Sequence, residues 1–352
     1  MSELHERPGV YSVYDASSVV SGGRAARIVG VAAKAAKGTV DKPVTVTGWA
    51  AGVMAFGGDE TPGMSTLLRL LFENGASAVT AVRVAEEGTA EDYARAFAAL
   101  GKEDAQVLVC DSGEADVHKA LRDAVEEASA LRRERIGVVG CAGAGVSELV
   151  SRAAELNSER MVLVGPDALD SGGKPISGVF AAAAAAALAA SVSDPATPLN
   201  GARLKGLTGL AADYSDNDID LLVRGGVTPL ECAGGVVSPV RGITTRTKTG
   251  GAADATWREL TTILIVDDVI PSVRSALRSR FSRTKNNARN RAAIRSQVIV
   301  ELEKKLAAEI IDGYDGVSVT ASAEDPTVCL VEFGFAVAHG LNQVRLTVHI
   351  EI

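Results

Sequence analysis

Aromatic residues are scarce in this sequence. Phe, Trp and Tyr together make up 4% of its 352 residues, whereas hydrophobic residues of all kinds reach 47%. Alanine is abundant instead, and there are 36 glycines. Because small side chains let helices and strands approach closely, we expect aliphatic, closely packed cores. A chain of this length is expected to hold two or three such domains.

Cysteines and long apolar runs are also few. The four cysteines lie far apart without C-x-x-C spacing, which indicates buried free thiols in a reducing compartment. The longest apolar run, residues 179–192, is mostly alanine and too short to span a bilayer. No basic segment followed by an apolar stretch opens the chain, as it would in a secretory signal. We therefore expect a soluble protein made in the cytoplasm, without membrane insertion.

The motifs of the common catalytic centres are absent. The sequence has no Gly-Lys-Ser/Thr, no Gly-x-Ser-x-Gly, and four histidines without metal-ligand spacing. Asp267 and Asp268 follow a predicted strand and can be read as a carboxylate pair or as capping acids of the next helix. We expect no catalytic residue, no metal and no cofactor, and hence a protein that is not an enzyme.

One glycine-rich turn keeps an alternative open. Residues 136–146 form a predicted strand, a turn with Gly140, Gly143 and Gly145, and the start of a helix. Such turns can hold a phosphate at a helix N-terminus. The spacing is not G-x-G-x-x-G, and the turn falls in the third α/β unit rather than the first. A tight structural turn is the favoured interpretation, and a nucleotide-binding α/β protein is the alternative.

The first half of the chain alternates short aliphatic strands with amphipathic helices. This pattern is typical of an open parallel sheet that helices cover on both faces. Strands are predicted at residues 27–33, 79–84, 106–110, 136–140 and 161–164, and helices at 90–100, 116–133, 147–156 and 179–190.

A linker-like segment, residues 194–201, precedes a second, α+β module. Its strongest predicted strand is the β-branched run at residues 261–266. Two helices are predicted next: one begins near Pro271, which suits a helix N-terminus, and the other spans residues 292–311. Two strands, at residues 328–338 and 344–352, close the chain.

A strongly basic segment lies within this module. Between Asp268 and Glu301 there are eight basic residues and no acidic one, although the whole chain has a net charge of −8. The remaining 28 basic and 44 acidic residues give the rest of the chain a charge of −16. A patch of one sign in an acidic protein indicates an acidic partner. That partner is a protein surface or a nucleic acid, unless the segment is simply a solvated face.

Both chain ends are predicted to be strands that cannot bury themselves. Alternation places apolar residues from 344 onwards on one face up to the last residue. Such a strand either closes the protein's own sheet or is added to the sheet of a neighbouring subunit. The residues concerned are Val10, Tyr11, Val13 and Tyr14 at the N-terminus, and Val344, Leu346, Val348, Ile350 and Ile352 at the C-terminus.

Several short motifs, taken in order, resemble the tail sheath proteins of contractile phages and related contractile injection particles. The Pro8-Gly9-Val10-Tyr11 opening resembles the Pro-Gly-Val start of that family. Leu70-Leu71-Phe72-Glu73-Asn74-Gly75, followed by Val79-Thr80-Ala81-Val82-Arg83-Val84, resembles its FF-x-NG … VVRV pattern. Pro198-Leu199-Asn200-Gly201 resembles its linker. The sequence departs from the family pattern at Thr228, where asparagine is usual, and before Arg246, where Trp-Gly is common.

The resemblance implies a structural subunit that polymerises with copies of itself into a helical sleeve around an inner tail tube. It implies contraction of that sleeve to drive the tube through a target cell envelope, with baseplate and tail terminator proteins as further partners. Both terminal strands would be exchanged between subunits, and the C-terminal helices would face the tube. We expect Arg274, Arg278, Arg280 and Arg283 to contact it, rather than a specific nucleic acid.

The domain prediction follows from the linker and the resemblance. It comprises an N-terminal arm at residues 1–26, an outer α/β domain at 27–195, and a linker with a short helix at 196–226. A tube-facing module at 227–340 and a strand arm at 341–352 complete it. The expected location is the tail of a virion or phage-like particle assembled in a bacterial cytoplasm.

Overall fold

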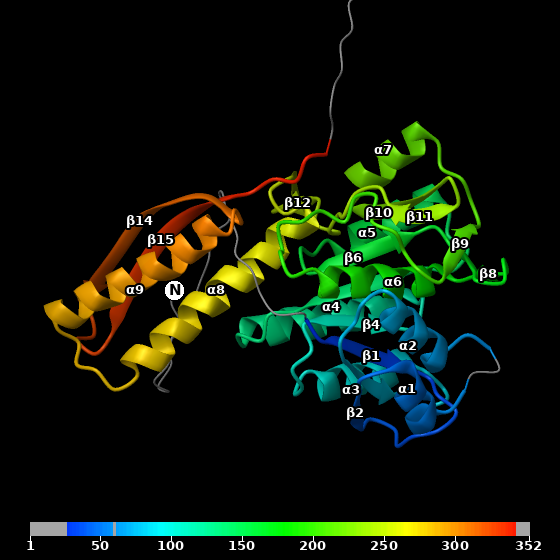
Figure 1. The fold of residues 1–352 in the computed structure, drawn as a ribbon, viewed down its shortest axis with the longest axis horizontal. Coiled ribbons are helices and arrows are strands. Elements are labelled where there is room, and N and C mark those ends of the chain that lie inside the picture. Colours follow the sequence, from blue (N-terminus) through cyan, green and yellow to red (C-terminus); the bar gives the residue numbers. More distant parts are fainter. Residues whose placement is uncertain (1–26, 59–60, 343–352) are drawn as a thin grey trace, which may run out of the picture.

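The structure, a computed structural model, describes residues 27–58 and 61–342. In these residues it consists of an α/β body and a smaller C-terminal lobe, which one long helix connects (Figure 1). None of the helices in these residues is both long and apolar enough to cross a bilayer.

The body is built on an eight-stranded sheet within the described residues, in the order β11-β10-β6-β5-β4-β1-β3-β2. The six strands from β10 to β3 are parallel, and β2 and β11 are antiparallel edges. This confirms the predicted open parallel α/β layer. The strands are β1 (Val29–Ala33), β2 (Pro43–Val46), β3 (Val79–Arg83), β4 (Val107–Cys110), β5 (Ile136–Gly140), β6 (Met161–Gly165), β10 (Val227–Ala233) and β11 (Val236–Pro239).

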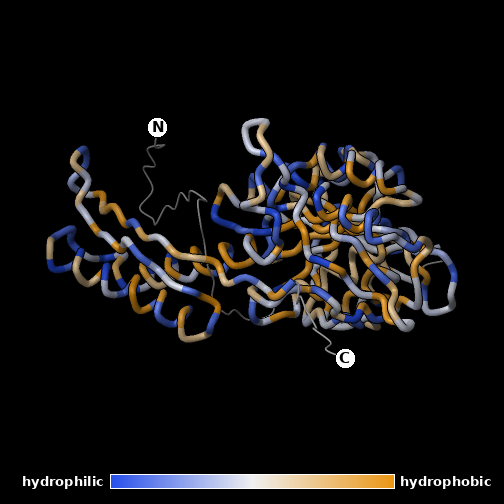
Figure 2. The backbone as a smooth tube through the Cα atoms, turned by 90° about the horizontal axis from the view of Figure 1, so that it is seen from above, coloured by the Kyte–Doolittle hydropathy of each residue, from blue (hydrophilic) through white to orange (hydrophobic). Residues whose placement is uncertain are grey.

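Helices cover both faces of this sheet, because the strands carry apolar side chains on both faces. Val31 on one face packs into a core with α1 (Trp49–Phe56), α2 (Met64–Glu73) and α6 (Gly178–Ser191). Leu108 on the other face packs into a core with helices that follow β3, β4 and β5. Those helices are α3 (Ala90–Leu100), α4 (Ala115–Ala130) and α5 (Val146–Leu156), and α7 (Asp216–Arg224) joins them through Leu222. Figure 2 shows the apolar segments concentrated inside the body.

The body also contains two small sheets in the described part of the chain. One is the three-stranded sheet of β7 (Ala168–Asp170), β8 (Pro175–Ile176) and β9 (Leu207–Leu210). The other pairs β12 (Lys248–Thr249) with β13 (Ala252–Ala253).

The C-terminal lobe combines two helices with a β-hairpin. α8 (Leu260–Phe281) leaves the body, α9 (Ala288–Ala307) returns beside it, and β14 (Ile311–Ala321) pairs antiparallel with β15 (Cys329–Val337). Val273 and Leu277 of α8 pack with Val298 and Leu302 of α9, and Phe333 on the hairpin packs against them. The lobe is thus a single helical layer on a two-stranded sheet (Figure 1).

The strand predicted at residues 261–266 is wrong, because these residues form the first turns of α8. Residues 262–270, including Asp267 and Asp268, are buried without a break, so this part of the helix is buried on all sides and shows no helical period in the sequence. A β-branched apolar run of this kind cannot be assigned by periodicity alone. Pro271 accordingly lies inside the helix and not at its start.

The predicted second helix corresponds to α9, but it ends earlier. Ile294, Val298, Leu302 and Leu306 lie on α9, whereas Ile310 follows it and is buried. β14 begins at the next residue, Ile311, and was not predicted. Its polar, glycine-containing sequence alternates weakly, which explains the omission.

The predicted start of the C-terminal module at residue 227 does not coincide with a change of sheet. Val227 pairs parallel with Leu163 of β6, and Leu230 pairs with Pro239 of β11. Both strands therefore extend the body's sheet. The chain passes to the lobe along α8, and after β15 it returns to the body, where Asn200 donates to Asn342 at 2.7 Å. The terminal strands predicted at residues 10–14 and 344–352 lie outside the described residues.

Candidate functional site

The glycine-rich turn after β5 is explained by packing. A Cβ atom on Gly140 would lie 2.2 Å from the carbonyl oxygen of Gly178, at the start of α6. Asp167 binds this turn to the next helix: its Oδ2 accepts the Gly143 amide at 2.8 Å, and its Oδ1 accepts the amide of Gly178, the first residue of α6, at 2.5 Å. The turn therefore has a carboxylate of its own, and the nucleotide alternative gains no support from it.

At the usual ligand crevice of a doubly wound sheet, the polar groups are also bound to one another. The strand order reverses between β1 and β4, and ligands of such folds bind beyond the carboxyl ends at that point. Here the Tyr93 hydroxyl donates to Asp111 Oδ1, and the Lys34 amide donates to Asp111 Oδ2 at 2.9 Å. Burial raises the pKa of the Asp111 carboxyl, and burial together with Asp111 raises that of Tyr93.

The remaining titratable groups of the body do not assemble into a centre. Burial lowers the pKa of His118 to about 4, so that this imidazole is neutral at physiological pH. Among the described residues no three His, Cys, Asp or Glu side chains come together as a metal site.

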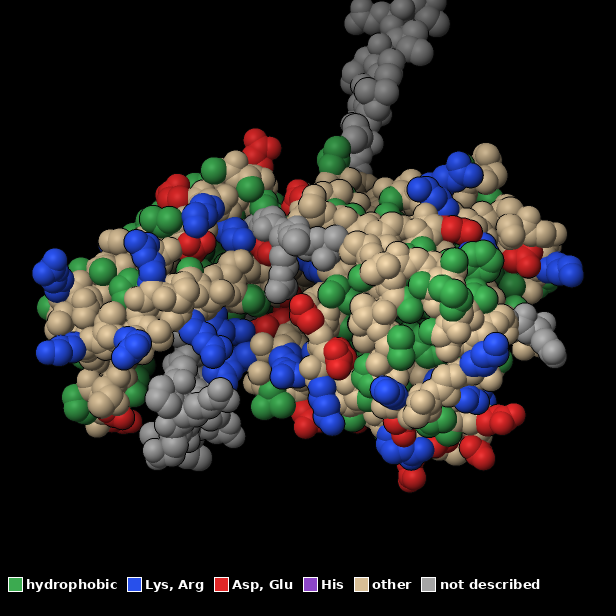
Figure 3. Space-filling view, turned by 60° about the horizontal axis from the view of Figure 1, so that its bottom comes forward, with side chains coloured by type: hydrophobic (Ala, Val, Ile, Leu, Met, Phe, Trp, Pro, Cys, Tyr) green, Lys and Arg blue, Asp and Glu red, His purple; other side chains and the backbone are tan. Residues whose placement is uncertain are grey.

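The basic segment forms the far end of the C-terminal lobe. It covers the second half of α8, the turn to α9 and the first half of α9. Asn286 in that turn donates to the carbonyls of Pro326 and Val328, and so ties the turn to the tip of the hairpin. Figure 3 shows mostly Lys and Arg among the charged side chains on the visible face of this lobe.

Four of the eight cations have no internal partner in the described part of the chain. Their side chains are exposed and make no hydrogen bond or ion pair there: Arg278, Arg283, Lys285 and Arg289. The Arg280 guanidinium donates to Gln297, that of Arg291 to Asn286, and that of Arg295 to the Val317 carbonyl at 2.9 Å.

Arg274 differs from the other arginines that the sequence analysis assigned to a partner surface. Its guanidinium lies 2.7 Å from a carboxylate oxygen of Glu134, a residue of the body, and the two side chains are only 13% and 11% exposed. Within the subunit this arginine joins the lobe to the body, so we remove it from the candidate surface.

Asp267 and Asp268 are neither helix caps nor a catalytic pair. They lie inside α8 and point to different partners. Arg160, just before β6, binds both carboxylate oxygens of Asp267 at 2.8 and 3.0 Å. Lys305 of α9 lies 3.0 Å from Asp268. All four side chains are buried, and the two aspartates hold α8 to the body and to α9 respectively.

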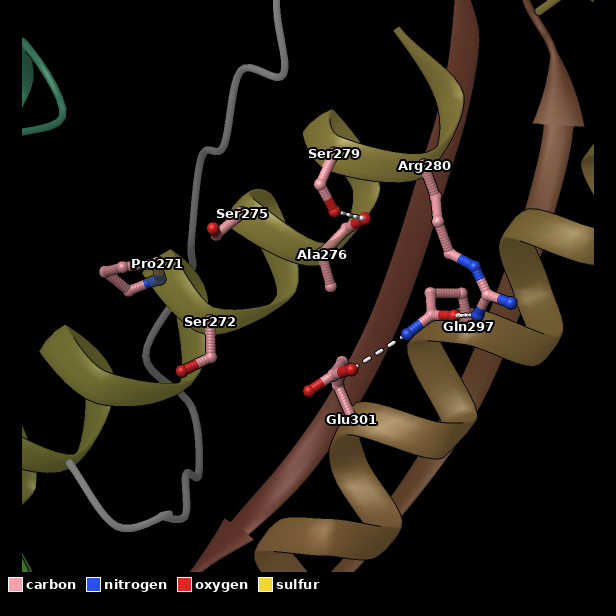
Figure 4. Close-up of a pocket in the computed structure, with 8 residues that line it drawn as sticks. All are labelled: Pro271, Ser272, Ser275, Ala276, Ser279, Arg280, Gln297 and Glu301. Carbon is pink, nitrogen blue, oxygen red and sulfur yellow. Dashed lines mark hydrogen bonds between the residues drawn. The ribbon is translucent and has the colours of Figure 1, made fainter.

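A polar groove of about 540 Å³ separates α8 from α9 (Figure 4). Small side chains on α8 form one wall. A chain of hydrogen bonds forms the other: Arg280 donates to Gln297, whose amide donates to Glu301 at 2.8 Å. The lining residues are Pro271, Ser272, Ser275, Ala276, Ser279, Arg280, Gln297 and Glu301.

The hairpin of the lobe has two open edges within the described residues, because β14 and β15 pair only with each other there. The strands are 11 and 9 residues long. Leu330 on β15 is 46% exposed. A long, partly apolar open edge is a surface that pairs readily with another strand. The sequence analysis did not predict β14, and therefore did not predict this hairpin or its open edges.

Two family models match consecutive parts of the chain. The model of the phage tail sheath protein central domain matches residues 86–245, and that of the phage tail sheath C-terminal domain matches residues 252–351. A tail sheath protein of Bacillus phage SP01 is 28% identical over 258 residues. That alignment covers 71% of this chain and 44% of the relative, so the chain spans less than half of its length.

Solved structures share the fold. A sheath tail protein from Desulfitobacterium hafniense superposes with a TM-score of 0.72 at 12% identity, covering 94% of this chain and all of that one. The helical sheath of the anti-feeding prophage in its contracted state superposes with a TM-score of 0.73 at 14% identity, covering 99% of this chain and all of that one.

Proposed function

Because the chain belongs to the phage tail sheath protein family, we propose that it is the structural subunit of a contractile tail sheath. Copies of the chain assemble into a helical sleeve around an inner tail tube, and contraction of the sleeve drives the tube through a target cell envelope. The protein is then a component of a virion or phage-like particle tail, with baseplate and tail terminator proteins as neighbours. Neither a cofactor nor catalysis is required.

The observation that carries this proposal is the open hairpin of the lobe. A two-stranded sheet is marginally stable alone, and β14 and β15 leave both outer edges unpaired within the described residues. Strands from neighbouring subunits supply the missing partners: one from Val10, Tyr11, Val13 and Tyr14, the other from Val344, Leu346, Val348, Ile350 and Ile352. Head-to-tail contacts that do not close into a ring generate a helical polymer.

The basic end of the lobe is the surface that faces the tube. We assign the contact to Arg278, Arg280 and Arg283, of which Arg278 and Arg283 have no partner in the described residues. Their tube-side partners are acidic side chains. Exposed ion pairs contribute about 0–1 kcal/mol each and weaken with salt. Such contacts hold the sleeve in register, yet they can be broken ring by ring during contraction.

Contraction proceeds by rotation of nearly rigid subunits. Buried ion pairs hold α8 to the body and to α9, so the connecting helix resists bending. The extended sleeve is a kinetically trapped lattice of higher free energy, and release at the baseplate lets it shorten and widen. The exchanged strands keep neighbouring subunits attached while they rotate.

Electron microscopy of the purified full-length chain, with and without residues 344–352, tests the assembly. We expect sleeves from the full-length chain and no polymer from the deletion. Replacing Leu346 and Val348 with aspartate should act like the deletion, whereas replacing Thr347 and His349 with alanine, on the opposite face, should not. A full-length chain that stays monomeric at high concentration with tube protein present contradicts the proposal.

Co-sedimentation with tube protein tests the basic surface. The charge reversals Arg278→Glu and Arg283→Glu should reduce tube binding and its salt dependence. Arg224→Glu is the matched control, because this exposed arginine lies on α7 of the body. Steep salt-dependent binding to DNA instead of tube protein would identify the segment as a nucleic-acid site.

A further inference from the structure

Two ion pairs join α8 to the body. Arg160 binds Asp267 through both terminal guanidinium nitrogens, and Glu134 binds Arg274. All four side chains are at most 13% exposed. Asp267 and Arg274 are seven residues apart, which corresponds to about two helical turns and about 10 Å along the axis. They therefore lie on one stripe of α8 that faces the body.

The arginines that contact α8 from the body are fixed at the ends of sheet strands. The Arg160 guanidinium also donates to the Arg135 carbonyl at 3.2 Å, just before β5. Arg27, just before β1, donates to the carbonyl of Leu264 on α8 and to that of Ala189 on α6. The guanidinium groups thus lie at the amino ends of parallel strands and cannot follow α8 if the helix shifts.

Backbone contacts anchor the first turn of α8, where the Leu260 amide donates to the Gly242 carbonyl at 3.0 Å and Glu259 bridges to Ile243, but apolar packing alone does not fix the later turns along this edge. Ile263, Val266 and Ile270 pack into the body's core at helical spacing. Such a stripe repeats every turn, so a shifted helix can form similar contacts. The charges do not repeat in this way. Along α8 the acid Asp267 is followed by the base Arg274, whereas their partners on the body are the base Arg160 and the acid Glu134.

The order of the charges penalises both directions of a two-turn shift. If α8 shifted by two turns in one direction, Asp267 would face Glu134. If it shifted by two turns in the other direction, Arg274 would face Arg160. Each places like charges together in a poorly solvated interface, which is unfavourable. The native register is the one that satisfies both pairs.

We propose that these four residues form a register latch: Arg160–Asp267 and Glu134–Arg274 together set the position of α8 on the body, and thereby the direction in which the C-terminal lobe projects. The four are positioning residues. The inference rests on the proposed function in one respect, since the projection of the lobe would set the radius and pitch of the sleeve. The latch itself is a property of the single chain.

The distribution of distances between the body and the lobe tests the latch directly. Spin labels are placed at Glu127→Cys on α4 and Ala293→Cys on α9, two exposed positions, with Cys232 and Cys329 replaced by serine. Double electron–electron resonance on the full chain should give one narrow distance distribution. Glu134→Arg and Arg274→Glu should each broaden or shift it, and the combined swap should restore it.

Two further variants keep the test decisive. Arg69→Glu breaks an ion pair inside α2, away from α8, and should leave the distance unchanged, although this pair is more exposed, at 25% and 39%. Glu134→Gln keeps the volume and serves if a reversal fails to fold; it should broaden the distribution. Single reversals without effect, or a swap that does not restore the distance, overturn the latch.

Electron microscopy of the same variants distinguishes a failure of the latch from a failure of the proposed sheath function. If the latch sets sleeve geometry, the single reversals should change the pitch or prevent assembly, and the swap should recover the wild-type pitch. A wild-type chain that forms no sleeve refutes the proposed function, while the distance measurement still decides the latch.

Discussion

Asp167 places one carboxylate oxygen 2.8 Å from the backbone nitrogen of Gly143, and its other oxygen accepts the amide of Gly178. A single side chain therefore joins the turn after β5 to the first residue of α6. The polar groups of this glycine-rich turn are thus bound within the protein rather than left free for a ligand.

Replacing Asp167 with alanine should lower the free energy of unfolding by about 1–3 kcal/mol, because both amides lose their acceptor. Asp167→Asn should cost less, since its carbonyl oxygen still accepts. Urea denaturation measures both, with Asp213→Ala at an exposed site as the control. A stability unchanged in Asp167→Ala would show that water replaces the carboxylate.

The glycines of the same turn should differ in their tolerance to alanine. Gly140→Ala places a methyl group against the backbone of Gly178 and should cost at least about 1–3 kcal/mol. Gly145→Ala has open space and a φ of −78° and should be nearly neutral. Thermal unfolding of the two variants makes the comparison. Equal damage at both positions would point to a role beyond packing.

The buried pair of Lys305 and Asp268 should be sensitive to loss of one partner. Lys305→Ala leaves an uncompensated buried carboxylate and should cost about 3–5 kcal/mol, whereas Lys305→Met combined with Asp268→Leu should cost much less. Lys304→Ala is the control, because its side chain is 61% exposed. If the double variant is less stable than Lys305→Ala, the attraction within the ion pair exceeds the free-energy cost of desolvating its two charges.

The four thiols should separate into two classes. Burial raises the pKa of Cys110 to about 12 and that of Cys141 to about 11, so both remain protonated and shielded at pH 8. Cys232 and Cys329 are partly exposed. A thiol-specific disulfide reagent should label these two in the native protein and the other two only after unfolding. Rapid native labelling of four thiols would contradict the packing of β4 and β5.

The α/β body could be predicted from the sequence because its signals are local. Short β-branched strands alternate with amphipathic helices, and residues such as Tyr93 and Phe97 mark a buried helix face one turn apart. The lobe was harder to predict. The apolar run at Ile263–Val266 is buried on all sides of a helix, so no period distinguishes it from a strand.

The candidate site could be predicted only as a charge pattern. The absence of acids between Asp268 and Glu301 identifies a basic segment, but it does not say which cation is already paired. Arg274 is bound by Glu134, which lies 140 residues away in sequence. Contacts of that kind depend on the tertiary fold and leave no local signal.

The alanine-rich helix α6 has a consequence for how this chain can vary. Its residues from Gly178 to Ala187 are all buried, and it lies against α2 on one side and β4, β5 and β6 on the other. A larger side chain would separate the layers, and glycine would weaken the helix. The alanine-rich helix should therefore tolerate few amino-acid substitutions. The exposed, charged end of the lobe, by contrast, can accept substitutions that match changes in a partner surface.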